Sequence, residues 1–296
     1  MKPPAGDPHE ALLPSRQLVF GPDYARRVSG LVGRLAAQEE RREGMGRAFL
    51  SGEGEEFIGH RPYRAGEDLR RLDWALYARL SRPYVKVMRR EATENWAVVL
   101  DASASMGVGV PGKLSSAAEV AMAVAALGLR AGARVSVVVA GGEGCHSLVL
   151  RRTSQWAGAL EQLGELLASG SAGLAHPSLP KRVRDAGRVL LLGDLFDLDP
   201  GDALRFARRG RNLALGQVLA PEELAPETGA AVEWVDVESG QRRRAHVDRP
   251  LRSAYERALE RRLDAWKQLA GRHRWGHACW ASTAPFEEPT LALCAP

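Results

Sequence analysis

The chain of 296 residues has few cysteines, few lysines and no long apolar run. Its three cysteines, Cys145, Cys279 and Cys294, are far apart and odd in number, which argues against a disulfide framework and fits a reducing compartment. No stretch approaches the roughly 20 consecutive apolar residues that a membrane span needs. The first residues, MKPPAGDPHEALLPSR, lack the apolar centre of a signal peptide, so we expect a cytoplasmic protein with no membrane partner.

The charge is positive but dispersed. Only five of the 41 basic residues are lysine, and the formal net charge is +5. Such a balance favours nucleic acid or an acidic partner. The arginines are spread along the chain instead of gathered on one element, and the many Ala and Gly residues are typical of a GC-rich genome. Nucleic-acid binding therefore remains an alternative function, and we do not expect nucleic acid as the partner.

Three parts of the chain differ in composition. Residues 1–22 are rich in Pro and polar residues and predict a disordered tail. Residues 23–94 predict a helix at Tyr24–Glu43, a Gly-rich stretch with short strands, and a block dense in Arg, Asp and aromatic residues, which we expect to pack on the sheet of the following domain.

Residues 95–296 alternate between strand and helix patterns. Strands are predicted at 96–100, 134–139, 147–151, 188–193, 213–219 and 275–281, and helices at 113–131, 154–168, 178–185, 200–210 and 251–273. This alternation predicts an α/β fold with a mostly parallel sheet covered by helices on both faces. Val232–Val247 predicts an inserted hairpin that turns at Ser239-Gly240.

Oxygen-bearing side chains follow a buried strand in the segment WAVVLDASASMG, residues 96–107. The apolar run ends at Asp101, and Ser103 and Ser105 follow at alternate positions. Ligands of open α/β sheets bind beyond the carboxyl ends of the strands. Hard oxygens on one tight loop suit Mg²⁺ or Mn²⁺, which can keep waters and accept a ligand from a partner.

A second strand ends in the same way. The segment RVLLLGDLFD, residues 188–197, places Asp194 directly after an apolar run. Two parallel strands can present their terminal carboxylates at one edge, so we expect Asp194 to join Asp101, Ser103 and Ser105 in a metal site. The alternative is that Asp194 only caps the following turn.

Three enzyme-like patterns are incomplete. GVGVPGKL, residues 107–114, resembles a phosphate-binding loop, but Leu114 stands where a hydroxyl must hold Mg²⁺. His273, His277 and Cys279 lack a second pair of zinc ligands. Ser103 has no histidine placed beside it by a motif and lies outside G-x-S-x-G. We therefore expect a protein that is not an enzyme; a metal-dependent phosphoester hydrolase or NTPase is the competing interpretation.

The motifs together resemble a known family. D-x-S-x-S after a buried strand resembles the metal-ion-dependent adhesion site of von Willebrand factor A domains. The upstream segment resembles the bacterial family called domain of unknown function 58, and the resemblance covers residues 23 to 296. The matching residues are Phe57, Arg61, Tyr63, Gly66, Asp68, Arg70, Asp73, Trp74, Ala78 and Arg79.

This resemblance implies a von Willebrand factor A-like, Rossmann-like fold and a partnership with a MoxR-type AAA ATPase. Such pairs assist the assembly or activation of client proteins, and the client here is unknown. Adhesion sites of this type also take a Thr from a third loop. The corresponding residues 167–178 contain no Thr, and Ser171 is the best substitute ligand.

The block from residue 61 to residue 79 has two interpretations. Arg61, Arg64 and Arg70 are candidate residues for docking an acidic partner. The mixed charges at close spacing favour internal pairing with Asp68 and Asp73 instead. On that interpretation Trp74 is a buried anchor.

Overall fold

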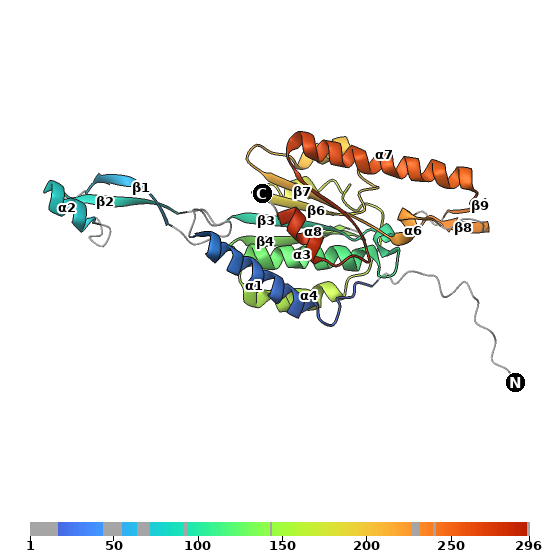
Figure 1. Ribbon diagram of the computed structural model, residues 1–296, viewed down its shortest axis with the longest axis horizontal. Helices are drawn as coiled ribbons and strands as arrows, with labels where there is room; N and C mark the ends of the chain where they lie inside the picture. Colours follow the sequence, from blue (N-terminus) through green and yellow to red (C-terminus); the bar gives the residue numbers. More distant parts are fainter. Residues whose placement is uncertain are drawn as a thin grey trace.

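A six-stranded sheet forms the centre of the computed structural model (Figure 1), which describes residues 17–43, 55–63, 72–90, 94–142, 144–226, 231–238 and 241–294. Its order is β10-β7-β6-β3-β4-β5. The strands are β3 (Asn95–Asp101), β4 (Arg134–Gly141), β5 (Gly144–Leu150), β6 (Arg188–Gly193), β7 (Asn212–Leu219) and β10 (Gly276–Ala281). Neighbours are parallel except β4 and β5, which are antiparallel. The predicted α/β fold with a mostly parallel sheet is confirmed, and all six strands lie where the sequence predicts them.

Helices cover both faces of this sheet. One face packs against α3 (Lys113–Arg130), α1 (Tyr24–Glu43), α4 (Trp156–Gly164) and α8 (Glu287–Cys294). The other packs against α7 (Arg249–His273), α5 (Leu179–Arg182) and the 3-10 helix η5 (Pro200–Phe206). All six residues of β6 are buried, because a parallel strand covered on both faces needs apolar side chains in both directions. Among the described helices, none is both long and apolar enough to cross a membrane.

The N-terminal segment is divided between two places. α1 packs on α3 through Tyr24, Val28 and Leu31. A second unit consists of α2 (Trp74–Leu80) and the antiparallel pair β1 (Glu55–Pro62) and β2 (Tyr84–Arg90), and Figure 1 shows it beside the six-stranded sheet instead of on it. The expectation that residues 23–94 pack on the sheet as one segment is therefore wrong for this unit. Trp74 is 63% exposed, so it is not the buried anchor that the aromatic pattern predicts.

Two short helices and a hairpin complete the described chain near the carboxyl ends of the strands. The 3-10 helix η3 (Ala104–Gly107) follows β3, and α6 (Pro221–Leu224) follows β7. The strands β8 (Ala231–Val235) and β9 (Arg242–His246) pair antiparallel, which confirms the predicted hairpin. Its predicted turn at Ser239-Gly240 lies outside the described residues. A 3-10 turn, η4 (Thr153–Gln155), precedes α4.

Close packing of α3 on the sheet gives a test of the core. A Cβ atom on Gly128 would lie 2.7 Å from Trp96 Cε3 and 2.9 Å from Val135 Cγ2, whereas one on Gly158 of α4 would contact nothing within 4 Å. We expect Gly128→Ala to lower the free energy of unfolding by about 1 to 3 kcal/mol through overpacking. Gly158→Ala should raise it by about 0.5 to 1 kcal/mol through helix propensity. Urea unfolding measures both, and equal effects of the two substitutions would contradict this packing.

Candidate metal-binding site

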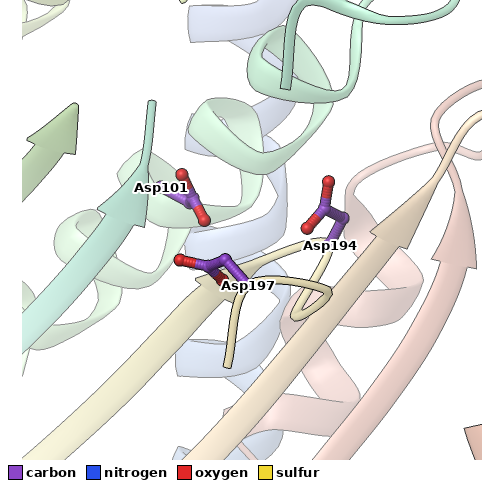
Figure 2. Close-up of side chains that lie close together, drawn as sticks. All are labelled: Asp101, Asp194 and Asp197. Atoms are coloured by element: carbon purple, nitrogen blue, oxygen red, sulfur yellow. The ribbon is translucent and has the colours of Figure 1, made fainter. Parts of the chain in front are cut away.

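Three aspartates meet where β3 and β6 end. β4, which follows β3 in the chain, lies on one side of β3, and the later strand β6 lies on its other side. The direction in which strands are added to the sheet therefore reverses between β3 and β6. Asp101 ends β3, and Asp194 and Asp197 follow β6. Each offers a carboxylate oxygen, and these oxygens lie within 4.8 Å of one another (Figure 2). This aspartate cluster occupies the edge at which open α/β sheets bind ligands.

Asp101 is fully buried and only half satisfied. Its Oδ1 accepts a hydrogen bond of 2.8 Å from the backbone N–H of Ser103. Its Oδ2 is buried without a hydrogen-bond partner among the described residues. Burial, followed by repulsion from Asp194 and Asp197, raises the pKa of Asp101 to about 8. An unpartnered buried carboxylate is costly unless a proton or a cation neutralises it.

Asp194 is held by a buried ion pair. Its Oδ2 accepts a hydrogen bond of 2.8 Å from Lys113 Nζ, which also lies 2.6 Å from Glu223 Oε1. Burial acts to lower the pKa of Lys113, but Asp194 and Glu223 outweigh that effect and raise it, so the ammonium stays charged. Oδ1 of Asp194 accepts from the N–H of Phe196 at 3.0 Å. With both oxygens engaged, Asp194 is better suited to reach an ion through water than to bind it directly.

The two serines lie on the same loop as Asp101. Ser103 and Ser105 have hydroxyl oxygens 3.1 Å apart, and the Ser103 side chain also interacts with Asp101. Asp101 is the last residue of β3, Ser103 caps η3 and Ser105 lies within it, so the D-x-S-x-S spacing places three oxygen-bearing side chains at the end of β3. The structure thus brings together the residues that the sequence predicts for this loop.

The third loop, residues 167–178, approaches the aspartate cluster with its backbone and not with a serine side chain. Ser171, the predicted ligand, is exposed, and Gly173 lies against the carboxylates instead. A Cβ atom on Gly173 would lie 2.7 Å from Oδ2 of both Asp101 and Asp197, and its φ of +25° also disfavours a side chain. The N–H of Ala175 donates to Asp197 Oδ2 at 3.0 Å. The prediction that Ser171 contacts the site is therefore wrong. The loop passes so close to the aspartate cluster that the residue above the carboxylates, Gly173, has no room for a side chain.

Asp197 is the ligand candidate that sequence reasoning missed. Burial raises its pKa; the hydrogen bond from Ala175 opposes this effect, and repulsion from Asp194 adds to it. Its Oδ1 is buried without a partner among the described residues. The sequence does contain a signal for it, because the segment of residues 188–197 has a second Asp three residues after Asp194.

An arginine from α7 fixes the loop that carries Asp197. Arg262 donates from NH2 to the carbonyl oxygens of Leu195 at 3.0 Å, Phe196 at 3.1 Å and Leu198 at 2.7 Å. Leu195 has a φ of 59°, a left-handed conformation that the surrounding contacts must hold. The carboxylate of Asp197 is therefore positioned before any ligand arrives.

A fourth acidic residue faces the site from the hairpin. Glu238 follows β8 and is exposed. Burial of part of its carboxyl and repulsion from Asp194 and Asp197 raise its pKa, and interaction with the Ser105 hydroxyl opposes the shift. No sequence motif connects Glu238 with Ser105, because their proximity depends on where the inserted hairpin folds.

The remaining predicted residues lie elsewhere. Arg61 is exposed on β1, and its NH1 donates to the carbonyl oxygen of Pro62 at 3.3 Å. Arg64 and Arg70 lie outside the described residues. Lys113, the lysine of the incomplete phosphate loop, is fully buried in its ion pairs, so its ammonium does not face an open loop.

Comparisons with known proteins give a family of unknown function. Residues 59–264 match the model of a family described as Protein of unknown function DUF58. Uncharacterised proteins of Mycobacterium tuberculosis and Mycobacterium bovis are 29% identical over 237 residues, which cover 75% of this chain and 74% of theirs.

Two solved structures are distantly similar, each at 13% identity. BatB from Bacteroides thetaiotaomicron has a TM-score of 0.34 and covers 60% of this chain and 99% of its own. An aerotolerance-related membrane protein from Bacteroides fragilis has a TM-score of 0.40 and covers 68% of this chain and 96% of its own. Similarity at this level carries no information on function.

The raised pKa of Asp101 predicts how stability depends on pH without metal. Folding raises the pKa of this carboxyl from 3.8 to about 8, so the folded protein binds the proton more tightly than the unfolded chain does. The resulting stabilisation of the folded state is complete below pH 3.8 and is lost as the pH rises through about 8. In chelator, we expect the melting temperature of the wild type to fall between pH 5 and pH 8, and Asp101→Asn to remove part of the fall. At pH 8 the substitution should stabilise the protein by about 1 to 3 kcal/mol.

The control for this experiment is Asp185→Asn, at an aspartate whose side chain is 79% exposed. Circular dichroism melts of the three proteins should separate Asp101→Asn from the other two. Identical pH profiles for all three would mean that Asp101 does not carry this buried charge.

Proposed function

This chain belongs to the DUF58 family of proteins of unknown function, and we propose that it is a non-enzymatic adaptor that recognises a partner protein through a bound Mg²⁺ or Mn²⁺. We further propose that its α/β domain is a von Willebrand factor A-like domain and that it works in the cytoplasm. The observation that carries the proposal is the pair of buried, unpartnered oxygens, Asp101 Oδ2 and Asp197 Oδ1, in the aspartate cluster.

Charge supports a divalent cation. The three clustered carboxylates share a single ammonium, that of Lys113, which Glu223 also contacts, so the buried setting carries an excess of negative charge. A divalent cation balances that excess and supplies the missing partners of the two oxygens. Ser103 and Ser105 would bind the ion directly, Asp101 and Asp197 directly or through water, and Asp194 through water.

The position that the protein leaves open suits a carboxylate of a partner. Mg²⁺ keeps several of its ligand positions for water or for a ligand from another molecule. An Asp or Glu side chain of the partner would complete the coordination shell, and neutralisation of charge at a partly desolvated site makes the contact selective. From the family resemblance, we propose that the partner is a MoxR-type AAA ATPase and that the pair acts on a client protein.

The competing function, metal-dependent hydrolysis of a phosphoester or NTP, would use the same aspartates. Such catalysis also needs a group that can accept a proton. Lys113 is held in its charged form by Asp194 and Glu223, so it is unsuited to that role. Lys113 is therefore not a candidate general base in such a reaction.

Metal affinity tests the site directly. Titration calorimetry with MnCl₂ should find one saturable site in the wild type, and Asp101→Asn, Asp197→Asn and the double substitution Ser103→Ala/Ser105→Ala should each weaken it by about 10- to 100-fold. The matched control is Ser171→Ala, which removes a serine hydroxyl from the neighbouring loop and should leave the affinity unchanged. A wild type without saturable binding, or equal affinities in all variants, would contradict the proposal.

Association with the ATPase tests the function. A MoxR-type AAA ATPase from the same cell should be retained by immobilised wild type and Ser171→Ala in Mg²⁺ and lost in EDTA. Ser103→Ala/Ser105→Ala should fail to retain it while melting cooperatively, because both serines lie beyond the sheet, at the start of η3 and within it. Retention that is insensitive to EDTA and to the double substitution would place the contact elsewhere. Metal-dependent turnover of a phosphoester, lost in Asp101→Asn, would show an enzyme.

A further inference from the structure

A basic cavity lies at the opposite end of the sheet from the aspartate cluster. Its volume is about 900 Å³, and it is lined by residues 207–213, residues 273–276 and Ala292 of α8. β7 begins at Asn212 and β10 at Gly276, and both run parallel to β6. The cavity therefore opens at the amino ends of these strands, beside the end of α7 that is farther from the β8–β9 hairpin (Figure 1).

The lining of this cavity is cationic. It includes Arg208, Arg209, Arg211 and Arg274, and none of the lining residues is acidic. These side chains come from two segments about 60 positions apart, so the dispersed arginines of the sequence are gathered here by the fold. A concave surface with charge of one sign concentrates counter-ions and charged ligands.

Hydrogen bonds fix this lining without neutralising it. The guanidinium of Arg211 donates to the carbonyl oxygens of Ala186 at 3.0 Å, Phe206 at 2.7 Å and Val183 at 2.8 Å. Arg208 donates to the carbonyl oxygen of Arg184 at 2.7 Å. Carbonyl oxygens carry no net charge. Burial and then repulsion from Arg208 lower the pKa of Arg211, and Asp185 offsets this only in part.

Helix capping explains part of the charge but not all of it. A cation at the C-terminal end of α7 interacts favourably with the helix dipole, which accounts in part for Arg274. Arg274 ends the helix with a φ of 55°, a conformation that favours glycine, so a charged residue here has a backbone cost. Arg208 and Arg209 belong to a different segment and have no such role at α7.

We propose that this cavity binds the phosphate groups of an anionic ligand. Guanidinium groups from two segments line this cavity, and a guanidinium can donate two parallel hydrogen bonds to phosphate oxygens. Arg211 contributes its charge only, because its N–H groups already donate to backbone carbonyl oxygens. The volume is in the range of small-ligand pockets. His273 and Trp275, which both line the cavity, stack with ring centroids 4.8 Å apart and offer an aromatic surface to a ligand. The site is separate from the aspartate cluster and does not depend on the proposed function.

Calorimetry with inorganic pyrophosphate in EDTA tests this inference while keeping the metal site empty. We expect saturable binding to the wild type, and a loss of about tenfold for each contact removed in Arg209→Ala/Arg274→Ala. The control, Arg26→Ala/Arg257→Ala, removes two exposed arginines from α1 and α7 and should bind as the wild type does. Arg211 is left intact because its hydrogen bonds hold the loop.

Further ligands identify the source of the phosphate. Tighter binding of ATP than of pyrophosphate indicates a free nucleotide, and tighter binding of a short oligothymidylate indicates nucleic acid; both support the site. Tighter binding of citrate than of pyrophosphate would overturn the assignment to phosphate. Equal losses in the two double variants, or no saturable binding of pyrophosphate, would overturn the site itself.

Discussion

Repulsion between buried carboxylates is the constraint around which the carboxyl end of this sheet is organised. Asp101 ends β3, Asp194 follows the adjacent strand β6, and Asp197 joins them from the same loop as Asp194. Like charges in a desolvated setting favour either a proton or a cation. Within the part of the chain that the structure describes, the ammonium of Lys113 pairs with Asp194, and one oxygen each of Asp101 and Asp197 has no hydrogen-bond partner.

The surrounding elements are arranged to hold this unfavourable cluster in place. Arg262 fixes the loop of Asp197 through three carbonyl oxygens, and Gly173 lets the third loop pass directly over the carboxylates. The packing of the sheet offsets the free-energy cost of bringing the carboxylates together, because β3 and β6 are buried along almost their whole length. Such preorganisation is typical of a site that binds a ligand with little rearrangement.

Local sequence patterns predict part of the fold and part of the candidate site. Strands and helices follow hydrophobic periodicity, and Asp101, Ser103 and Ser105 lie together because they are neighbours in sequence. Lys113 meets Asp194 and Glu223 across separations of 81 and 110 positions, which no local pattern encodes. Gly173, and not the expected Ser171, contacts the carboxylates because of how closely one loop passes another. The position of Glu238 near the site depends on where the inserted hairpin folds. Arg208, Arg209, Arg211 and Arg274 look dispersed in the sequence for the same reason, because only the fold brings them to one cavity.

The central claim is that a divalent cation occupies the aspartate cluster. A crystal grown with MnCl₂ and measured above the manganese absorption edge tests it most directly, because the anomalous signal locates the metal independently of its assigned ligands. We expect a single strong peak beside Asp101 and Asp197, within coordination distance of the Ser103 and Ser105 hydroxyls. A map without a peak there, in crystals that show manganese elsewhere on the same molecule, would contradict it.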